Sequence, residues 1–161
     1  MDFKTVRVQI PEGANIILGQ THFIKTAEDL YEILAGASPH IKFGVAFTEA
    51  SGPCLIRHEG NDGDLTQNAV GILQNIGAGH VFAILIRDAF PINVLNSIKM
   101  CPEVCRIFCA TANPLEIVVA ETEQGRGIMG VIDGSSPKGV EKDSDRAARK
   151  ALLRNFGYKV K

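Results

Sequence analysis

The chain of 161 residues is 45% hydrophobic and 22% charged, and its 17 Lys and Arg nearly balance its 18 Asp and Glu. This is the composition of a soluble globular protein, and four cysteines in a chain of this length do not suggest a small disulfide-stapled scaffold. A chain of this length buries roughly 70% of the surface that its unfolded form exposes. We therefore expect one domain over residues 1–161.

The longest uninterrupted apolar run, residues 81–86, is far shorter than the roughly 20 residues that a membrane-spanning helix needs. We expect no membrane contact. The first residues alternate apolar with polar side chains and lack the apolar stretch of a signal peptide. The four cysteines fit a reducing compartment, so we expect a cytoplasmic protein.

Charge is unevenly distributed along the chain. Residues 138–161 hold eight Lys and Arg against three acidic residues, a net charge of +5, whereas residues 1–137 hold nine against 15, a net charge of −6. A basic tail on an acidic body favours a contact with another subunit or with nucleic acid. No nucleic-acid motif accompanies it, so nucleic-acid binding is not favoured.

Apolar periodicity and turn residues predict strands over residues 3–10, 15–19, 42–49, 54–58, 80–87, 104–111, 115–122 and 128–133. Helical spacing predicts helices over residues 27–36, from 64 to near 77, from 91 onward and over 143–155. Thr26 with Asp29 forms an approximate capping box, and Asp64 is the expected cap of the second helix.

The strands over 42–49 and 54–58 are expected to form a hairpin, because the turn residues Ser51-Gly52-Pro53 separate them. The strand over 80–87 is apolar on both faces, which marks a central strand covered by helices from both sides. The sequence therefore predicts an α/β fold, a three-layer α/β/α sandwich with a mixed β-sheet.

Familiar nucleotide motifs are absent or misplaced. No P-loop sequence occurs, and the one Gly-x-Gly-x-x-Gly match, residues 125–130, leads into a predicted strand instead of the helix that a dinucleotide site needs. We interpret it as a tight turn. Arg126, between two of these glycines, could hold a phosphate or could be an ordinary solvated turn residue.

Cys101, Cys105 and Cys109 recur every four residues, which is not the Cys-x-x-Cys spacing of zinc sites. Two of them fall on one predicted strand and the third at a helix end. We interpret all three as small buried residues, and the sequence assigns no metal site.

His80 follows Gly77-Ala78-Gly79, where a helix ends and the central strand begins. A neutral imidazole there can act as a nucleophile or base, and glycine-flanked backbone N–H groups such as that of Gly79 can receive an anion. The alternative is a histidine hydrogen-bonded at a strand start. Against a site here, ligands of open α/β sheets bind beyond the carboxyl ends of strands, and His80 lies at an amino end.

Other polar residues follow the ends of predicted strands. Arg87, Asp88 and Asn93 stand at a strand-to-helix junction, where they could hold a phosphate or a sugar hydroxyl or simply form an internal ion pair and a helix start. Four further residues close apolar strands and could line a cleft for a cation or hydroxyl: Glu49, Asn113, Glu121 and Gln124.

Long segments of the chain carry a resemblance to a known family. They include Gly79-His80-Val81-Phe82, the run from Arg87 to Asn96, the run from Pro102 to Pro114, Ala120 to Gly127 and Gly130 to Gly134, together with Phe43 to Phe47 and Glu49 to Pro53. These segments closely resemble the adenosine-specific kinases, and the match spans essentially the whole chain.

The resemblance implies a three-layer α/β/α fold, a homotrimer, binding of adenosine and AMP in preference to ADP or ATP, and a phosphorylated histidine, which maps to His80. It suggests that His80 accepts a phosphoryl group and passes it to a ribose hydroxyl of adenosine. Gly79, Arg87 and Arg126 would hold the phosphoryl oxygens, and Asp88 or Glu49 would orient His80 or deprotonate the hydroxyl.

Asn93, Asn113, Glu121 and Gln124 are further substrate-binding candidates. No tightly bound cofactor is expected, although Mg²⁺ could arrive with a phosphoryl donor. The alternative function is a non-catalytic adenosine/AMP-binding sensor, which the absence of ATP motifs favours. A third interpretation is a structural trimer whose basic C-terminal helix packs on an acidic neighbour.

Overall fold

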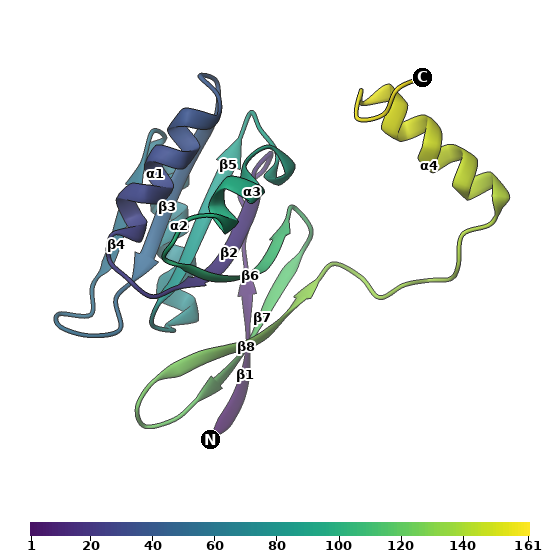
Figure 1. The fold of residues 1–161 in the computed structure, drawn as a ribbon. Helices are drawn as coiled ribbons and strands as arrows, with labels where there is room; N and C mark the ends of the chain where they lie inside the picture. Colours follow the sequence, from purple (N-terminus) through teal and green to yellow (C-terminus); the bar gives the residue numbers. More distant parts are fainter.

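The protein is described from a computed structural model that covers residues Met1–Lys161 (Figure 1). The strands are β1 (Asp2–Val8), β2 (Asn15–Thr21), β3 (Lys42–Thr48), β4 (Ile56–Gly60), β5 (Val81–Arg87), β6 (Val104–Thr111), β7 (Leu115–Glu121) and β8 (Arg126–Asp133). The helices are α1 (Thr26–Ala37), α2 (Gly63–Ile76), α3 (Pro91–Lys99) and α4 (Asp143–Asn155). The type and order of these elements are those predicted from the sequence.

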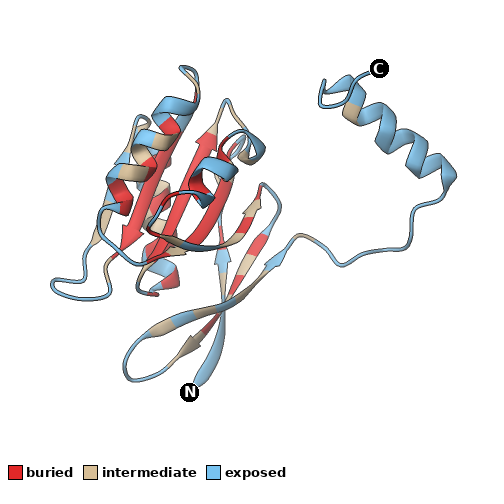
Figure 2. Cartoon of the chain, in the orientation of Figure 1, coloured by how far each residue is buried: buried red, intermediate tan, exposed pale blue.

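Five strands form the main sheet, in the order β4-β3-β5-β2-β6. The central strand is β5, and its residues from Val81 to Ile86 are all buried, as their apolar character predicts. β3 and β4 pair as the expected hairpin. The red strands in Figure 2 show that the core lies along this sheet.

Helices and a second sheet cover the two faces of the main sheet. On one face, α1 and α3 pack side chains such as Leu34 and Ile98 against Ile84. On the other face, α2 and the small sheet β1-β7-β8 pack side chains such as Leu73 and Ile117 against the other side of β5. The expected α/β sandwich is confirmed.

Strand pairing differs from the mixed sheet that was predicted. Every pair of named strands in both sheets is antiparallel, and one isolated parallel bridge joins Ala78 to Arg126. A strand apolar on both faces is typical of parallel sheets. Here the same pattern arises because β5 lies at the centre of an antiparallel sheet that is covered on both sides.

The starts of two helices also differ from the sequence prediction. α2 is capped by Asp62, whose carboxylate accepts a 3.0 Å hydrogen bond from the backbone N–H of Leu65, so Asp64 lies within the first turn. At α1 the Thr26 hydroxyl donates back to the carbonyl of Phe23 and does not cap the helix. A Ser, Thr or Asp near a helix start can serve either role, and spacing alone does not distinguish them.

The last helix, α4, stands apart from the rest of the chain at the end of an extended linker (Figure 1). None of its residues is buried, and Figure 2 shows it almost wholly exposed. Its presence over residues 143–155 is as predicted. None of the helices combines the length and apolar character needed to cross a membrane.

Candidate functional site

His80 is held between the ends of two neighbouring strands. Its backbone N–H donates to the carbonyl of Thr48 at 2.9 Å, and its carbonyl accepts from the backbone N–H of Thr21 at 3.0 Å. Because β3 and β5 are antiparallel, the carboxyl end of β3 lies beside the amino end of β5. The position of His80 at an amino end therefore no longer counts against a site here.

The backbone of His80 is in the left-handed region, with φ +56°. This conformation costs a residue with a Cβ roughly 1–2 kcal/mol, and such residues gather at functional sites. Cys54, on the neighbouring loop, also has a positive φ, of +50°. The backbone is thus strained at His80 and on the loop after β3.

A buried threonine fixes the turn that carries His80. The Thr48 hydroxyl accepts a hydrogen bond from the Val81 N–H at 2.9 Å and lies 2.7 Å from the carbonyl oxygen of Ala78, to which it donates. Thr48 is only 7% exposed, so these bonds form away from water. Thr48 was not predicted as a site residue, because a threonine at the end of a strand is ordinary.

His80 borders a cavity of about 350 Å³, here called the histidine cavity. The ring of buried Phe47 lies against the imidazole, with the ring centroids 6.0 Å apart and the planes 22° from parallel. The full lining is His22, Phe23, Ile24, Phe47, Glu49, Ala50, Ser51, Gly52, Pro53 and His80. Phe23 is 51% exposed, which makes it an accessible apolar wall of this cavity.

A second cavity, of about 570 Å³, lies on the other side of the loop that begins at Glu49 and is here called the glycine cavity. Glu49 and Ala50 line both cavities. The full lining is Glu49, Ala50, Cys54, Gly77, Gly79, Ala120, Thr122, Gln124, Gly125, Arg126 and Gly127. Four residues predicted from the sequence therefore meet here: Glu49, Gly79, Gln124 and Arg126.

Gly79 allows the loop after β3 to approach the turn before β5. A Cβ at position 79 would lie 3.0 Å from the Cβ and 3.3 Å from the Cα of Ala50. These distances are shorter than ordinary van der Waals contact. A larger residue at position 79 would push against Ala50, so glycine favours this close approach, and Gly79 lines the glycine cavity.

Glu49 anchors the loop that separates the two cavities. One carboxylate oxygen accepts from the backbone N–H of Leu55 at 2.8 Å, and the other accepts from Nε and Nη2 of Arg57 at 3.0 and 2.8 Å. The Leu55 N–H first, and then Arg57, lower the pKa of Glu49 below its ordinary value. Glu49 is therefore ionised at neutral pH, but its bonds go to the loop and not to His80.

Arg126 is engaged by the protein itself. Its Nε pairs with the carboxylate of Glu121, and its Nη1 lies 3.3 and 3.4 Å from the carbonyls of Asn75 and Ile76 at the end of α2. Glu121 also pairs with Lys4 at 2.6 Å. The predicted pair Glu121 and Arg126 is thus brought together, with Arg126 as the member that lines the glycine cavity.

Arg87 and Asp88 lie at the opposite end of β5 from His80. The strand has seven residues, so at 3.4 Å per residue the two ends are about 20 Å apart. Arg87 donates to the carbonyl of Glu12 at 3.2 Å and pairs with Asp64 at 3.3 Å. Neither Arg87 nor Asp88 can reach His80 within this chain, because a strand holds its two ends apart.

Asn93 and Asn113 also have local partners away from His80. The Asn93 side chain accepts a 2.8 Å hydrogen bond from the backbone N–H of Phe90 and so supports the start of α3. The Asn113 amide donates to the carboxylate of Asp133 at 3.1 Å. The structure therefore separates these two candidates from the histidine and glycine cavities.

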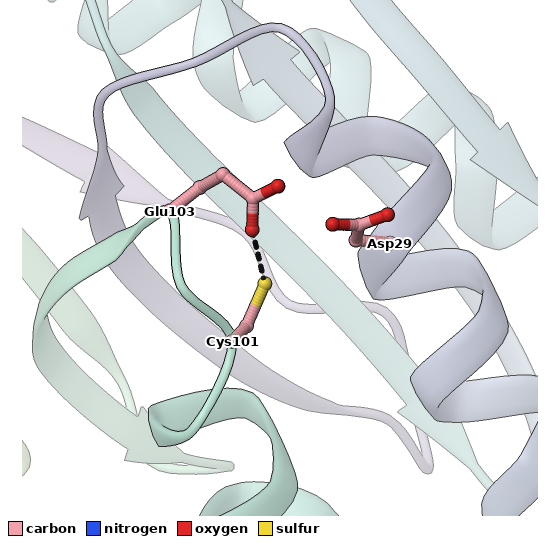
Figure 3. A group of neighbouring side chains, drawn as sticks. All are labelled: Asp29, Cys101 and Glu103. Carbon is pink, nitrogen blue, oxygen red and sulfur yellow. Dashed lines mark hydrogen bonds between the residues drawn. The ribbon is translucent and has the colours of Figure 1, made fainter.

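Asp29, Cys101 and Glu103 gather beside α1, with potential ligand atoms within 4.8 Å of one another (Figure 3). The Cys101 thiol donates to Glu103 at 2.7 Å, and burial raises the pKa of Cys101 to about 11. The Lys25 ammonium lies 2.9 Å from Asp29 and 3.6 Å from Glu103. The protonated Cys101 thiol and the Lys25 ammonium of the same chain are the partners of the two carboxylates. We therefore assign the cluster a structural role.

The cysteine interpretation holds for two of the three residues. Cys101 and Cys109 are buried, but Cys105 is exposed. The pairing of β6 with β2 shifts register twice. At the second shift Arg106 lies opposite Gln20 and Val104 lies opposite Thr21, so Cys105 between them has no partner on β2. A bulge of this kind breaks the alternation of strand faces, so Cys105 and Cys109 do not share the predicted buried environment.

Comparisons with known proteins agree with this architecture. A family described as adenosine-specific kinase matches residues 6–159. The crystal structure of PH1918 protein from Pyrococcus horikoshii OT3 is similar, with a TM-score of 0.95 and 43% sequence identity over 99% of each chain. None of the curated proteins compared with the chain matches it. The chain belongs to the adenosine-specific kinase family.

Proposed function

We propose that this chain binds adenosine and AMP beside His80 and acts as a phosphotransferase through a phosphohistidine at that residue. The observation that carries the proposal is the placement of a backbone-strained histidine at the wall of one cavity, next to a second cavity bordered by glycine N–H groups and Arg126. Membership of the family supports adenosine as the ligand class.

The nucleoside would lie in the histidine cavity. This cavity has the apolar walls that a purine needs, and Phe23 and Pro53 are its accessible apolar faces. Phe47 and Phe82, which lie in β3 and β5 beside His80, are 1% and 0% exposed and serve the core. Phe23 was not singled out from the sequence, because a loop residue carries no periodic signal, and Pro53 was interpreted there only as a turn residue.

The phosphoryl oxygens would face the glycine cavity, where the Gly79 N–H and Arg126 are the candidate donors. In the first step the donor's phosphorus–oxygen bond breaks and a bond from phosphorus to His80 nitrogen forms. In the second step that bond breaks, the ribose oxygen attacks phosphorus, and the hydroxyl proton leaves to solvent or to Glu49. The covalent intermediate divides one difficult displacement into two easier ones.

Glu49 is the one carboxylate that lines either cavity. Three N–H bonds already occupy most of its oxygen lone pairs, so it does not form a cage for a resident metal ion. Mg²⁺, if required, would arrive with the donor and be held mainly by its phosphates. Asp88 has no role in this scheme, because it lies beyond the far end of β5.

The second candidate function is a non-catalytic adenosine/AMP sensor. The contacts of Arg126 with Glu121 and the end of α2 favour it, because a phosphate would have to compete for this guanidinium. Under this alternative AMP binds but no phosphoryl group is transferred. The homotrimer and the cytoplasmic location implied above belong to the same proposal.

Intact-mass spectrometry tests the phosphotransferase directly. The protein is incubated with ATP, alone and with adenosine, and compared with His80→Ala. We expect an acid-labile gain of one phosphate on the wild type, its loss on adding adenosine with AMP formed, and no gain on His80→Ala. His22→Ala, which alters another histidine of the same cavity, is the matched control and should still gain the phosphate.

AMP binding without transfer from any donor would contradict the enzyme and support the sensor. Isothermal titration calorimetry with AMP on the same preparations separates these outcomes. Absence of AMP and adenosine binding would contradict both.

A further inference from the structure

The small sheet leaves one face uncovered. On β7, Leu115, Ile117 and Val119 point into the core, so the alternate residues Val118 and Ala120 point away from it. Cross-strand partners share a face, which adds further residues to this outward side. We call it the outer sheet face, and it consists of Phe3, Thr5, Arg7, Glu116, Val118, Ala120, Gly127, Gly130 and Ile132. Ala120 and Gly127, at one edge of this face, also line the glycine cavity.

Apart from Thr5 and an ion pair between Arg7 and Glu116, 3.5 Å apart, this face is apolar. Phe3 is 62% exposed and Ile132 is 48% exposed, while Val118 and Ala120 are half-buried between them. A sheet face of this kind is stable when another element covers it. No element of the same chain does so in Figure 1.

Two glycines lie in the middle of the outer sheet face. Gly127 is opposite Ala120 and Gly130 is opposite Val118, and a Cβ at either glycine would meet no atom within 4 Å. Glycine weakens a strand and is found where another backbone approaches closely. Because neither position has a side chain, a helix can approach the backbone of the small sheet closely here.

The same chain carries a helix without a partner. Ala148, Leu152 and Phe156 recur every four residues and form one apolar side of α4 and its C-terminal cap. Leu152 is 50% exposed and Phe156 is 65% exposed. An isolated helix of 13 residues is marginal in water, so α4 needs a packing surface to persist.

Charge indicates that the surface belongs to a second copy of the chain. The segment that contains α4 has a net charge of +5, and residues 1–137 have a net charge of −6. The linker before α4 runs away from its own body (Figure 1). Glu141 pairs through both carboxylate oxygens with Arg149, at 3.0 and 2.8 Å, which ties the end of this linker to the helix.

We propose that α4 of one copy docks with its Ala148, Leu152 and Phe156 side on the outer sheet face of a second copy. Each chain then gives one helix and receives one, a heterologous contact that closes when the copies form a ring. The inference rests on the assembly included in the proposed function and not on its chemistry. It identifies the surfaces that hold the copies together.

Sedimentation velocity tests the contact from both sides. The disrupting variants are truncation after Gly139, Leu152→Glu with Phe156→Glu, and Val118→Glu. Matched controls place glutamate at exposed apolar residues elsewhere: Val160→Glu, 89% exposed, and Ile92→Glu, 66% exposed. Loss of a central apolar contact should raise the concentration for half-assembly on the order of a hundredfold, whereas the controls should assemble like the wild type.

Cysteine cross-linking identifies the two surfaces. In a background with Cys54→Ser and Cys105→Ser, Ala148→Cys and Ala120→Cys are made singly and mixed, so that any heterodimer on a non-reducing gel is formed between chains. We expect this heterodimer, and none when Ala148→Cys is mixed with Ile92→Cys. Circular dichroism confirms that each variant is folded.

A monomeric wild type, an oligomer that survives truncation, or assembly unaffected by Val118→Glu without the cross-link would each overturn the proposal. Calorimetry with AMP on the wild type separates this result from the proposed function. An oligomer that fails to bind AMP would contradict the ligand assignment and leave the contact intact.

Discussion

The two ends of β5 are alike in backbone conformation and different in what they can bind. His80, directly before the strand, has φ +56°, and Asp88, directly after it, has φ +58°, so both are non-glycine residues in the left-handed region. At the far end, Arg87 is paired with Asp64 and with the carbonyl of Glu12. At the near end, the backbone of His80 is bonded while its imidazole borders a cavity.

The difference shows which polar residues remain available to a ligand. Groups that satisfy one another, such as Asn113 with Asp133, already have their hydrogen-bond partners within the protein. A side chain whose backbone is fixed and whose ring faces a cavity can bind a ligand without breaking the fold. We therefore assign the chemistry to the His80 end of β5.

The largest expected effect on stability comes from Thr48→Val. The change leaves the Val81 N–H and the Ala78 carbonyl without their partner in a buried position, at a cost of about 1–3 kcal/mol. For a chain of this size each kcal/mol lowers the melting temperature by roughly 2–4 °C. Thr48→Ser keeps the hydroxyl and should recover most of the loss in differential scanning calorimetry, and equal losses in both variants would contradict the role of this hydroxyl.

Arg126→Gln and Arg87→Gln test which end of β5 lies near the phosphate of bound AMP. If Arg126 releases Glu121 to hold a phosphate, AMP affinity should fall about tenfold, the effect of a hydrogen bond worth about 1.4 kcal/mol. Adenosine, which lacks the phosphate, should bind within a factor of about three of the wild type. The control is Arg87→Gln at the far end of β5. A fall in AMP affinity in this control would contradict the assignment of the phosphate to the glycine cavity.

Glycine substitution at the two strained positions gives a smaller effect. His80→Gly and Asp88→Gly both relieve a positive φ, and glycine's own entropic cost offsets part of the gain, so each should change stability by about 1 kcal/mol or less. Asp88→Gly should retain phosphorylation by ATP, whereas His80→Gly should lose it. Equal activity in the two variants would refute a special role for His80.

The smallest effect concerns pH and the loop anchored by Glu49. The pKa of Glu49 is lowered from its ordinary value of 4.5, so its contribution to stability is complete above about pH 4.5 and is lost as the pH falls through the lower folded pKa. Chemical denaturation of wild type and Glu49→Gln should show a difference that is constant from pH 7 to 5 and shrinks below 4.5. A difference that grows on acidification would contradict the anchor.

Much of the fold could be predicted because the strands and helices have strong periodic patterns. The apolar run from Val81 to Ile86 identified the central strand, and Ser51-Gly52-Pro53 identified the hairpin. Strand direction could not be predicted, since burial on both faces has the same pattern in a covered antiparallel sheet. The division into two sheets depends on long-range pairing that local sequence does not encode.

The candidate site could be predicted only in part. His80, Gly79 and Arg126 stood out because glycines flank them, and Glu49 and Gln124 followed strand ends that the fold brings together. Arg87, Asp88, Asn93 and Asn113 had equally suggestive positions, and only the length of β5 and their local partners separate them from His80. Phe23 and Thr48 carried no signal.

The most direct test of the central assignment is an NMR titration of the histidine ring signals with AMP. The four histidines sample different places: His80 and His22 line the histidine cavity, whereas His40 and His58 lie outside it. We expect saturating AMP to shift the ring signals of His80 and His22 and to leave those of His40 and His58 unchanged. AMP binding that leaves the His80 ring unshifted would contradict it.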